Sequence, residues 1–188
     1  QKLYSTQQPD RAVNDLLALV GRQMKVSRVY VFENSEDNRF CSNTYEWCAE
    51  GIAPEIDNLQ LVSYETDIPH YEDNFDEQGI FYVEDIRTLP QNLYDILAPQ
   101  GIKSLLHCAI RDNGVFRGYI GFDECVEERM WTRDQIRLLQ YFSEVLGMQT
   151  TMNVIIPGYP GAPARRPIPV MYLLHVMSQD YSCWLRFS

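Results

Sequence analysis

The chain has 188 residues, of which 45% are hydrophobic and 12% aromatic, and its formal net charge is −10. This length and composition predict a globular protein with one substantial core and an appendage. The acidic balance argues against nucleic-acid or anionic-membrane partners, because both require clustered Lys and Arg side chains. No apolar run reaches the roughly 18 residues of a membrane span and no leader is evident, so we expect a cytoplasmic protein.

The cysteines follow no regular spacing and include no CxxC pair; they are Cys41, Cys48, Cys108, Cys125 and Cys183. An odd, irregular set of this kind is typical of reduced, buried thiols in a reducing compartment. Cys41 and Cys48 would also point to opposite faces of a regular strand. We therefore predict structural thiols and no metal site.

The first half of the chain predicts a helix, a hairpin and a long connection. Apolar residues recur at helical spacing from about Pro9 or Asp10 to Lys25, which indicates an amphipathic helix. Two β-rich runs follow, at residues 28–33 and 39–47, separated by a polar turn. Residues 49–76 are acidic and irregular, with room for one or two short helices, and a connection of this length is more often a functional flap than an idle loop.

The second half predicts a strand at residues 81–86, a helix at 92–98 and then a hairpin. The hairpin turn is indicated by Asn113-Gly114, a dipeptide that tolerates the positive φ angles of a type I′ turn. Thr132 and Gln135 form a capping-box pattern, which predicts a last helix from there to about Asn153. Two long helices that bracket about five strands indicate an α+β fold with an antiparallel sheet.

A regular two-residue turn also predicts which hairpin residues share a face. One face would carry small and apolar side chains suited to helix packing: Leu105, His107, Ala109, Phe116, Gly118, Ile120 and Phe122. The opposite face would carry Cys108, Arg117 and Tyr119 and would be left for a pocket or for solvent.

The composition changes after Val154. Residues 157–169 contain five prolines, and residues 154–188 contain three arginines and one aspartate. No domain can be built on such a Pro-Gly stretch. We therefore divide the chain into a domain at residues 1–153 and a tail or linker at residues 154–188, for which a non-native sequence is the competing interpretation.

The order of elements, with the segments SNTYEWCAEGIAPEIDNLQ, QGIKSLLHCAIRDNGVFRGYIGFDE and MWTRDQIRLLQYFSEVLG, resembles a GAF domain of bacterial signalling proteins such as diguanylate cyclases and histidine kinases. The resemblance implies an antiparallel sheet of five to six strands, with the N- and C-terminal helices packed on one face and a ligand pocket on the other. Pocket walls are typically apolar and aromatic with a few placed polar groups. The candidate ligand-binding residues are accordingly Tyr45, Trp47, Asp57, Asn58, Cys108, Arg117 and Tyr119.

Each candidate also has a plain structural interpretation. Tyr45 and Trp47 are more often core aromatics than ligand contacts, Arg117 more often forms a surface ion pair, and His107 is best explained as a core histidine that faces the helices. Glu46 and Glu50 resemble paired catalytic carboxylates, but solvated charges explain them better because no third group accompanies them.

The sequence motifs of GAF subfamilies with a specific chemistry match this sequence poorly. Asn74-Phe75-Asp76-Glu77 lacks the lysine and the spacing of the cyclic-nucleotide pattern, and His107-Cys108 has the wrong order for bilin attachment. The cysteine segments differ from those of the free methionine sulfoxide reductases, and no P-loop or GGDEF-like motif occurs.

The resulting expectation is a non-catalytic regulatory domain that binds an unknown small molecule and relays its occupancy through the terminal helices. The resemblance further implies a homodimer formed through those helices and a C-terminal output domain. The alternatives are a dimerisation spacer without ligand and a cysteine-based methionine sulfoxide reductase. No cofactor can be named from the sequence.

Overall fold

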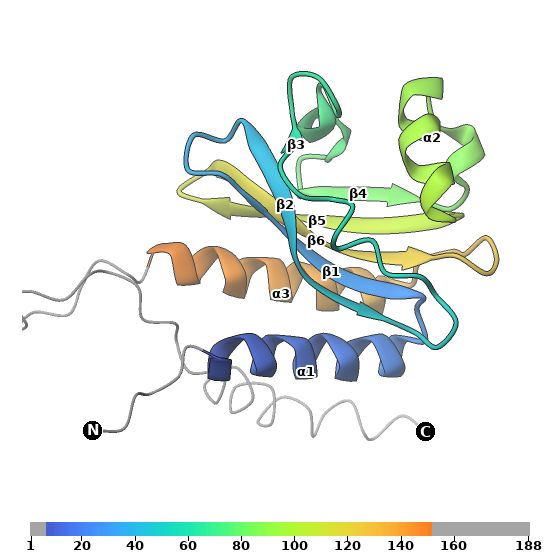
Figure 1. Ribbon diagram of the computed structural model, residues 1–188, viewed down its shortest axis with the longest axis horizontal. Helices are drawn as coiled ribbons and strands as arrows, with labels where there is room; N and C mark the ends of the chain where they lie inside the picture. Colours follow the sequence, from blue (N-terminus) through green and yellow to red (C-terminus); the bar gives the residue numbers. More distant parts are fainter. Residues whose placement is uncertain (1–6, 152–188) are drawn as a thin grey trace, which may run out of the picture.

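The computed structural model describes residues 7–151, which form a six-stranded antiparallel sheet with helices on both faces (Figure 1). The strand order across the sheet is β3-β2-β1-β6-β5-β4. The strands are β1 (Arg28–Asn34), β2 (Phe40–Cys48), β3 (Val62–Ser63), β4 (Ile80–Val83), β5 (Ser104–Asp112) and β6 (Val115–Glu124). The predicted α+β fold with five to six antiparallel strands is confirmed.

The two long helices, α1 (Gln7–Met24) and α3 (Arg133–Thr151), lie on the same face of the sheet (Figure 1). α1 packs against β1 and β2, whereas α3 packs against β5 and β6. Between the helices and the sheet lies one apolar core that includes Leu17, Val29, Phe122 and Leu139. The two bracketing helices were predicted from the sequence, and their position on one face is confirmed.

The opposite face is covered by α2 (Gln91–Leu97) and by the long connection between β2 and β4, which contains the short helix η1 (Tyr71–Asn74) (Figure 1). Two further short helices, η2 (Ile86–Thr88) and η3 (Ala98–Gln100), flank α2. A second apolar core fills this side and is rich in aromatic rings, among them Tyr30, Phe32, Tyr71, Phe75 and Tyr119.

Side-chain hydrogen bonds cap the start of α3 and the end of α1. The Thr132 N–H donates to Gln135 Oε1 at 2.9 Å and the Gln135 N–H donates to Thr132 Oγ1 at 3.3 Å, so the predicted capping box at the start of α3 is confirmed. Arg129 donates to the Met24 carbonyl at 2.8 Å and to the Lys25 carbonyl at 2.6 Å. Its guanidinium thus caps the C-terminal end of α1.

Two β-bulges set which side chains face which core. In β2, Tyr45 pairs with Val31 but Asn43 pairs with Phe32, so Thr44 is the extra residue. In β6, Gly118 pairs with Ile110 but Phe116 pairs with Arg111, so Arg117 is the extra residue.

Gly118 permits the bulge in β6. Its φ is +134°, and a Cβ atom at this position would lie 2.0 Å from the Phe32 carbonyl oxygen of β1. Only glycine accepts both conditions at low cost.

The predicted faces of the β5–β6 hairpin are therefore wrong for the β5 residues and for Phe116, whereas Ile120 and Phe122 face the long helices and Tyr119 faces away from them, as predicted. The Asn113-Gly114 turn has the expected positive φ angles of 50° and 80°. However, the extra residue shifts the pairing by one, so the residues of β5 that pair with Ile120 and Phe122 are Cys108 and Leu106 rather than His107 and Leu105. Leu105, His107 and Ala109 consequently face away from the long helices, and Cys108 faces toward them.

The predicted tail at residues 154–188 lies outside the described residues, as does the end of the predicted last helix beyond Thr151. Among the helices within residues 7–151, none combines the length and apolar character that a bilayer crossing requires.

Candidate functional site

A small cavity of about 50 Å³ lies on the face of the sheet opposite α1 and α3. Its walls come from the sheet, from the connection between β2 and β4, and from α2 and η3. The part of the lining that carries polar groups consists of Arg28, Tyr30, Asn43, Glu46, Glu55, Tyr71, Gln100, His107, Tyr119 and Asp123, and the apolar part includes Phe32, Leu59, Val62, Ile68, Ile96, Leu97 and Ile102.

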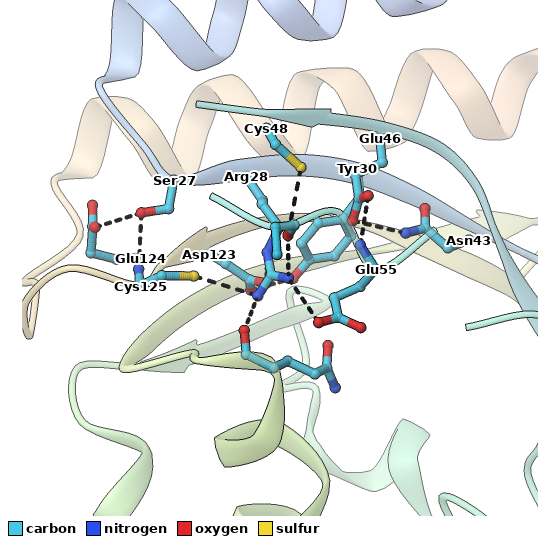
Figure 2. A network of polar contacts seen from close by, with 12 residues as sticks. Ser27, Arg28, Tyr30, Asn43, Glu46, Cys48, Glu55, Asp123, Glu124 and Cys125 are labelled. Carbon is cyan, nitrogen blue, oxygen red and sulfur yellow. Dashed lines mark hydrogen bonds and ion pairs between the residues drawn. The ribbon is translucent and has the colours of Figure 1, made fainter. Parts of the chain in front are cut away.

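Arg28 is the central charged residue of the cavity and is only 1% exposed. Figure 2 shows its guanidinium between Asp123, Cys125 and Glu55. Nη2 donates to the Gln100 carbonyl at 2.8 Å, which ties η3 to the sheet. Nε lies 3.3 Å from Asp123 Oδ2, an ion pair by distance, although its N–H is not directed at any acceptor. Nη1 lies 3.9 Å from Glu55 Oε1, so two carboxylates contact one buried guanidinium.

A chain of buried polar groups continues from Asp123 across the sheet. The Tyr30 hydroxyl donates to Asp123 Oδ1 at 2.6 Å and lies 2.6 Å from His107 Nε2. The Tyr71 hydroxyl lies 3.1 Å from His107 Nδ1. Because Tyr30 gives its only proton to Asp123, the consistent tautomer has His107 Nε2–H donating to Tyr30 and Tyr71 donating to Nδ1. The chain thus connects η1 to the buried ion pair.

Burial fixes the protonation states along this chain. Desolvation lowers the pKa of His107 to about 3, so the imidazole is neutral at pH 7. Desolvation also raises the pKa of Asp123 to about 6, against the opposing effect of Arg28 and of the Tyr30 hydrogen bond. Burial and the neighbouring Asp123 raise the pKa of Tyr30 well above its usual value, so Tyr30 stays a donor.

Glu46 and Asn43 of β2 form the other polar wall of the cavity. Glu46 Oε2 accepts the backbone N–H groups of Glu55 at 2.9 Å and Ile56 at 3.1 Å, and thereby holds the connection to the sheet. Glu46 Oε1 accepts from Asn43 Nδ2 at 3.2 Å (Figure 2). Asn43 is 1% exposed, and its Oδ1 is buried without a hydrogen-bond partner. The cavity wall therefore contains an acceptor with no donor.

A second, open hollow of about 470 Å³ lies between η1 and the tip of the β5–β6 hairpin. It is lined by Asn34, Asn38, Tyr64, His70, Tyr71, Glu72, Asp73, Gly114, Val115 and Phe116. Tyr71 lines both hollows, so its ring forms a common wall between the buried cavity and the open one.

Three of the predicted ligand-binding residues lie on the other side of the sheet. Tyr45, Trp47 and Cys108 belong to the core under α1 and α3 and do not line the cavity. The prediction that they form its wall is wrong, because the bulges place Asn43 and Glu46 there instead. Trp47 lies so close to α1 that a Cβ atom on Gly21 would be 2.0 Å from the indole ring.

The other four predicted residues have mixed positions. Tyr119 lines the cavity, and its ring stacks on His107 with 4.8 Å between centroids. Arg117 lies outside the cavity and donates to Asn38 Oδ1 at 3.2 Å. Asp57 and Asn58 are exposed in the connection that covers the cavity, without lining it. A ligand contact for Tyr119, Asp57, Asn58 or Arg117 stays a prediction.

The sequence reasoning missed the polar core of the site, Arg28, Tyr30, His107 and Asp123. The position of Arg28 at the start of a β-rich run was a possible signal. If such a strand is buried, its charged residue requires a partner. His107 was assigned to the wrong face because the bulge was not foreseen. Gly118, inside the β6 pattern, was the signal for that bulge.

Comparison with known proteins agrees with this architecture. The sequence profile of the family described as GAF domain matches residues 8–149. The chain belongs to the GAF domain family. A curated relative, the methanogenesis regulatory histidine kinase FilI of Methanothrix harundinacea, is 34% identical over 142 residues, which cover 73% of this chain and 16% of that protein. The chain thus spans about a sixth of this much longer relative.

Several solved structures share the fold at low sequence identity. The phycocyanobilin-bound GAF domain from a cyanobacterial phytochrome has a TM-score of 0.64 at 15% identity and covers 76% of this chain and 84% of its own. The blue-light-absorbing PixJ GAF domain of Thermosynechococcus elongatus has a TM-score of 0.62 at 15% identity and covers 99% of both chains. A domain of a putative sensor histidine kinase from Sinorhizobium meliloti 1021 has a TM-score of 0.56 at 11% identity, with 78% and 93% covered.

This GAF domain does not fit a bilin in the structure as it stands. The cavity of about 50 Å³ is far smaller than the several hundred cubic ångströms of typical ligand sites, and a tetrapyrrole is larger still. Cys108, next to His107 in sequence, faces the helices rather than the cavity. Burial also raises the pKa of Cys41 to about 11 and of Cys48 and Cys108 to about 12, which disfavours the thiolate that covalent or redox chemistry needs.

Within the part of the chain that the structure describes, no cluster of His, Cys, Asp and Glu side chains has the arrangement of a metal site.

Proposed function

We propose that this GAF domain is the input domain of a signalling protein, which binds a small molecule in the buried cavity and relays its occupancy to an output domain through α1 and α3. The observation that carries this proposal is the structure of β2. Asn43 and Glu46 line the cavity, whereas Tyr45 and Trp47 of the same strand pack in the core under the helices. One strand therefore contacts both the ligand site and the first helix.

The tight contact between Trp47 of β2 and Gly21 of α1 supports such a relay. Trp47 occupies the space where any side chain at position 21 would be, so a displacement of β2 must displace α1 as well. A ligand that binds one arrangement of β2 better than another would shift the population of helix positions by its difference in affinity. The mechanism needs no catalytic residue, and we propose a non-catalytic, cytoplasmic domain.

The identity of the output domain is proposed from the relative of known type. The 34% identity to part of a histidine kinase favours an output of that class over a diguanylate cyclase. We further propose that the domain forms a homodimer through its terminal helices, so that both helices of each subunit reach the output domains side by side.

Native mass spectrometry of the full chain purified from its own host tests the proposal. We expect a noncovalent adduct of constant mass that is lost when the protein is denatured. A thermal-shift screen with small metabolites complements it, because a ligand that binds only the folded state must raise the apparent stability. An absence of any adduct, together with no shift by any compound, contradicts the sensory proposal.

A second candidate function is a dimerisation spacer that binds no ligand. The observation in its favour is the dense aromatic packing of the cavity side, where Phe32 and Tyr119 stack at 4.7 Å and Tyr71 and Tyr119 lie 5.5 Å apart. The two functions differ in the result of the adduct and thermal-shift experiments, whereas both predict a dimer.

A further inference from the structure

We infer that the buried cavity selects a small organic cation, a protonated amine with a short apolar body, and rejects anions of the same size. This inference rests on the proposed ligand-sensing function and adds the chemical class of the ligand. Its supports are the charges that line the cavity, the unpaired acceptor on Asn43, the aromatic rings and the volume.

The charge balance disfavours an anionic ligand. One cation, Arg28, faces three carboxylates in the cavity wall, those of Glu46, Glu55 and Asp123. Arg28 is already engaged with Asp123 at 3.3 Å, with Glu55 at 3.9 Å and with the Gln100 carbonyl at 2.8 Å. A ligand carboxylate or phosphate would therefore have to displace these partners and approach the remaining negative charges, which costs free energy in a buried site.

Asn43 supplies the second, independent observation. Its side chain lines the cavity at 1% exposure, its Nδ2 is committed to Glu46, and its Oδ1 accepts no hydrogen bond. A buried acceptor without a donor costs free energy until a donor arrives. An ammonium group at this place would donate to Asn43 Oδ1 while lying beside the Glu46 carboxylate.

The remaining wall suits the body of such a ligand. Tyr30, Phe32 and Tyr71 contribute aromatic rings to the wall, and such rings attract cations at their free faces, whereas the ring of Tyr119 is already stacked on Phe32 and His107. Leu59, Val62 and Ile68 of the covering connection complete an apolar surface. The volume of about 50 Å³ corresponds to roughly four water positions, which matches a ligand of about four heavy atoms.

The test compares n-propylammonium and 1-propanol, which share a propyl body and differ only in their head group, with propionate, an anion of similar size. Each is titrated into the full chain by isothermal calorimetry and by NMR at constant ionic strength and pH 7.5. We expect propylammonium to bind at least tenfold more tightly than 1-propanol, and propionate to show no binding. A ligand of four heavy atoms binds no more tightly than about tens of micromolar, so the titrations extend to millimolar concentrations.

Two variants locate the binding site. Asn43→Leu removes the acceptor at similar size and is expected to lower propylammonium affinity at least tenfold, whereas Asn92→Leu makes the same change on the exposed surface of α2 and should leave it unchanged. Should Asn43→Leu fail to fold, Glu55→Gln removes one carboxylate charge from a half-buried position at nearly constant shape. It is expected to weaken propylammonium about three- to tenfold and to leave 1-propanol unaffected.

The inference is overturned if propionate binds more tightly than propylammonium, if propylammonium and 1-propanol bind equally, or if none of the three binds. Equal affinity of Asn43→Leu and the parent chain for propylammonium overturns it as well. None of these results contradicts the proposed sensory function, which the adduct experiment tests separately. A neutral or anionic adduct from the host would support ligand sensing and would show that the ligand is not an amine.

Discussion

At the scale of single residues, the buried pair of Arg28 and Asp123 is the most consequential feature of the site. Both side chains are nearly inaccessible, at 1% and 2% exposure, and each compensates a charge that the interior would otherwise reject. Such a pair adds little to the folding stability compared with apolar residues of the same size. The loss of one partner, however, leaves the other charge uncompensated in the interior. Arg28 also connects the sheet to η3 and to the connection over the cavity.

We predict that Arg28→Met lowers the free energy of unfolding by about 3–5 kcal/mol, because Asp123 remains buried without its cation. Chemical denaturation at pH 7.5 measures the change. The double variant Arg28→Met/Asp123→Asn should recover part of the loss, since the orphaned charge is then absent. Losses that add without any recovery would contradict the account of the pair as a coupled unit.

The two histidines that the structure places in opposite environments allow a pH prediction. Unfolding restores the ordinary pKa of 6.5 to His107, whereas in the folded protein its pKa is about 3. The stability due to neutral His107 is therefore present above pH 6.5 and is lost as the pH falls toward 3. At pH 4.5 we expect a loss of about 2–3 kcal/mol from this residue alone.

Asp123 acts in the opposite direction, because its folded pKa of about 6 lies above its ordinary 3.8. Its contribution is present below pH 3.8 and is lost as the pH rises toward 6, which offsets part of the His107 effect. We therefore predict that His107→Gln loses less stability than the parent chain between pH 7.5 and 4.5. His70→Gln, at a histidine whose side chain is 87% exposed, provides the same substitution outside the core for comparison. Parallel curves for His107→Gln and the parent chain would exclude the buried neutral histidine.

At the scale of elements, the contact between β2 and α1 is the step on which the proposed relay depends. Alanine at an internal helix position is normally about 1 kcal/mol more favourable than glycine. At Gly21 we predict the opposite sign, a loss of about 1–3 kcal/mol for Gly21→Ala, because the new methyl group would lie 2.0 Å from the Trp47 ring. Thermal and chemical denaturation measure the change.

The double variant Gly21→Ala/Trp47→Leu serves as the control for this contact. Since the smaller side chain leaves room for the methyl group, the cost of Gly21→Ala should largely disappear in that background, with a coupling of about 1 kcal/mol or more. An unchanged cost would show that helix and strand are not in the close contact that the relay requires.

The arginine that caps α1 gives a further prediction at this scale. Arg129 donates to the carbonyls of Met24, the last residue of α1, and of the following Lys25, pairs with Glu124 at 3.1 Å and lies over the Trp131 ring at 5.2 Å. We expect Arg129→Ala to lower the free energy of unfolding by about 1–3 kcal/mol, because several partly buried acceptors lose their donor. Arg137→Ala, an exposed arginine of α3, should change it by less than about 0.5 kcal/mol. Equal effects of the two variants would contradict the capping role.

Element identities followed from local sequence, whereas the faces of the strands did not. The helix periodicity, the Asn113-Gly114 turn and the Thr132–Gln135 capping box are local signals, and each was predicted from neighbouring residues. The bulges at Thr44 and Arg117 depend on how the strands pair across the sheet, which a period-two pattern cannot reveal. For this reason the aromatic residues Tyr45 and Trp47 were assigned to the cavity, although the small and polar Asn43 faces it.

At the scale of the whole molecule, the sheet separates two cores with different tasks. The core under α1 and α3 is apolar and joins the terminal helices to the strands. The core on the other face is aromatic and contains the buried polar chain and the cavity. The fold was predictable because both cores arise from the order of elements. The polar chain was not predictable, since its residues come from η1, β1, β5 and β6 and meet only in three dimensions.

This division predicts an uneven distribution of local stability. Amides of β1, β5 and β6 pair on both sides within the sheet and lie over buried side chains, so they should exchange with solvent only through global unfolding. The connection at residues 49–76 pairs with the sheet mainly through the two residues of β3 and is held to β2 by the Glu46 carboxylate. We expect its amides to exchange through local opening, with rates at least tenfold faster than those of the central strands.

Hydrogen exchange followed by mass spectrometry measures both regions in one experiment, and Glu46→Gln tests their connection. Loss of the carboxylate weakens the hold on the backbone N–H groups of Glu55 and Ile56, so exchange in residues 49–76 should accelerate while the central strands remain slow. If the connection exchanged as slowly as β1 in the parent chain, the cavity would have no route to enlarge or to admit a ligand on the side away from the helices. The aromatic side chains would then fill this side of the domain without admitting a ligand, and the spacer function would explain this GAF domain better.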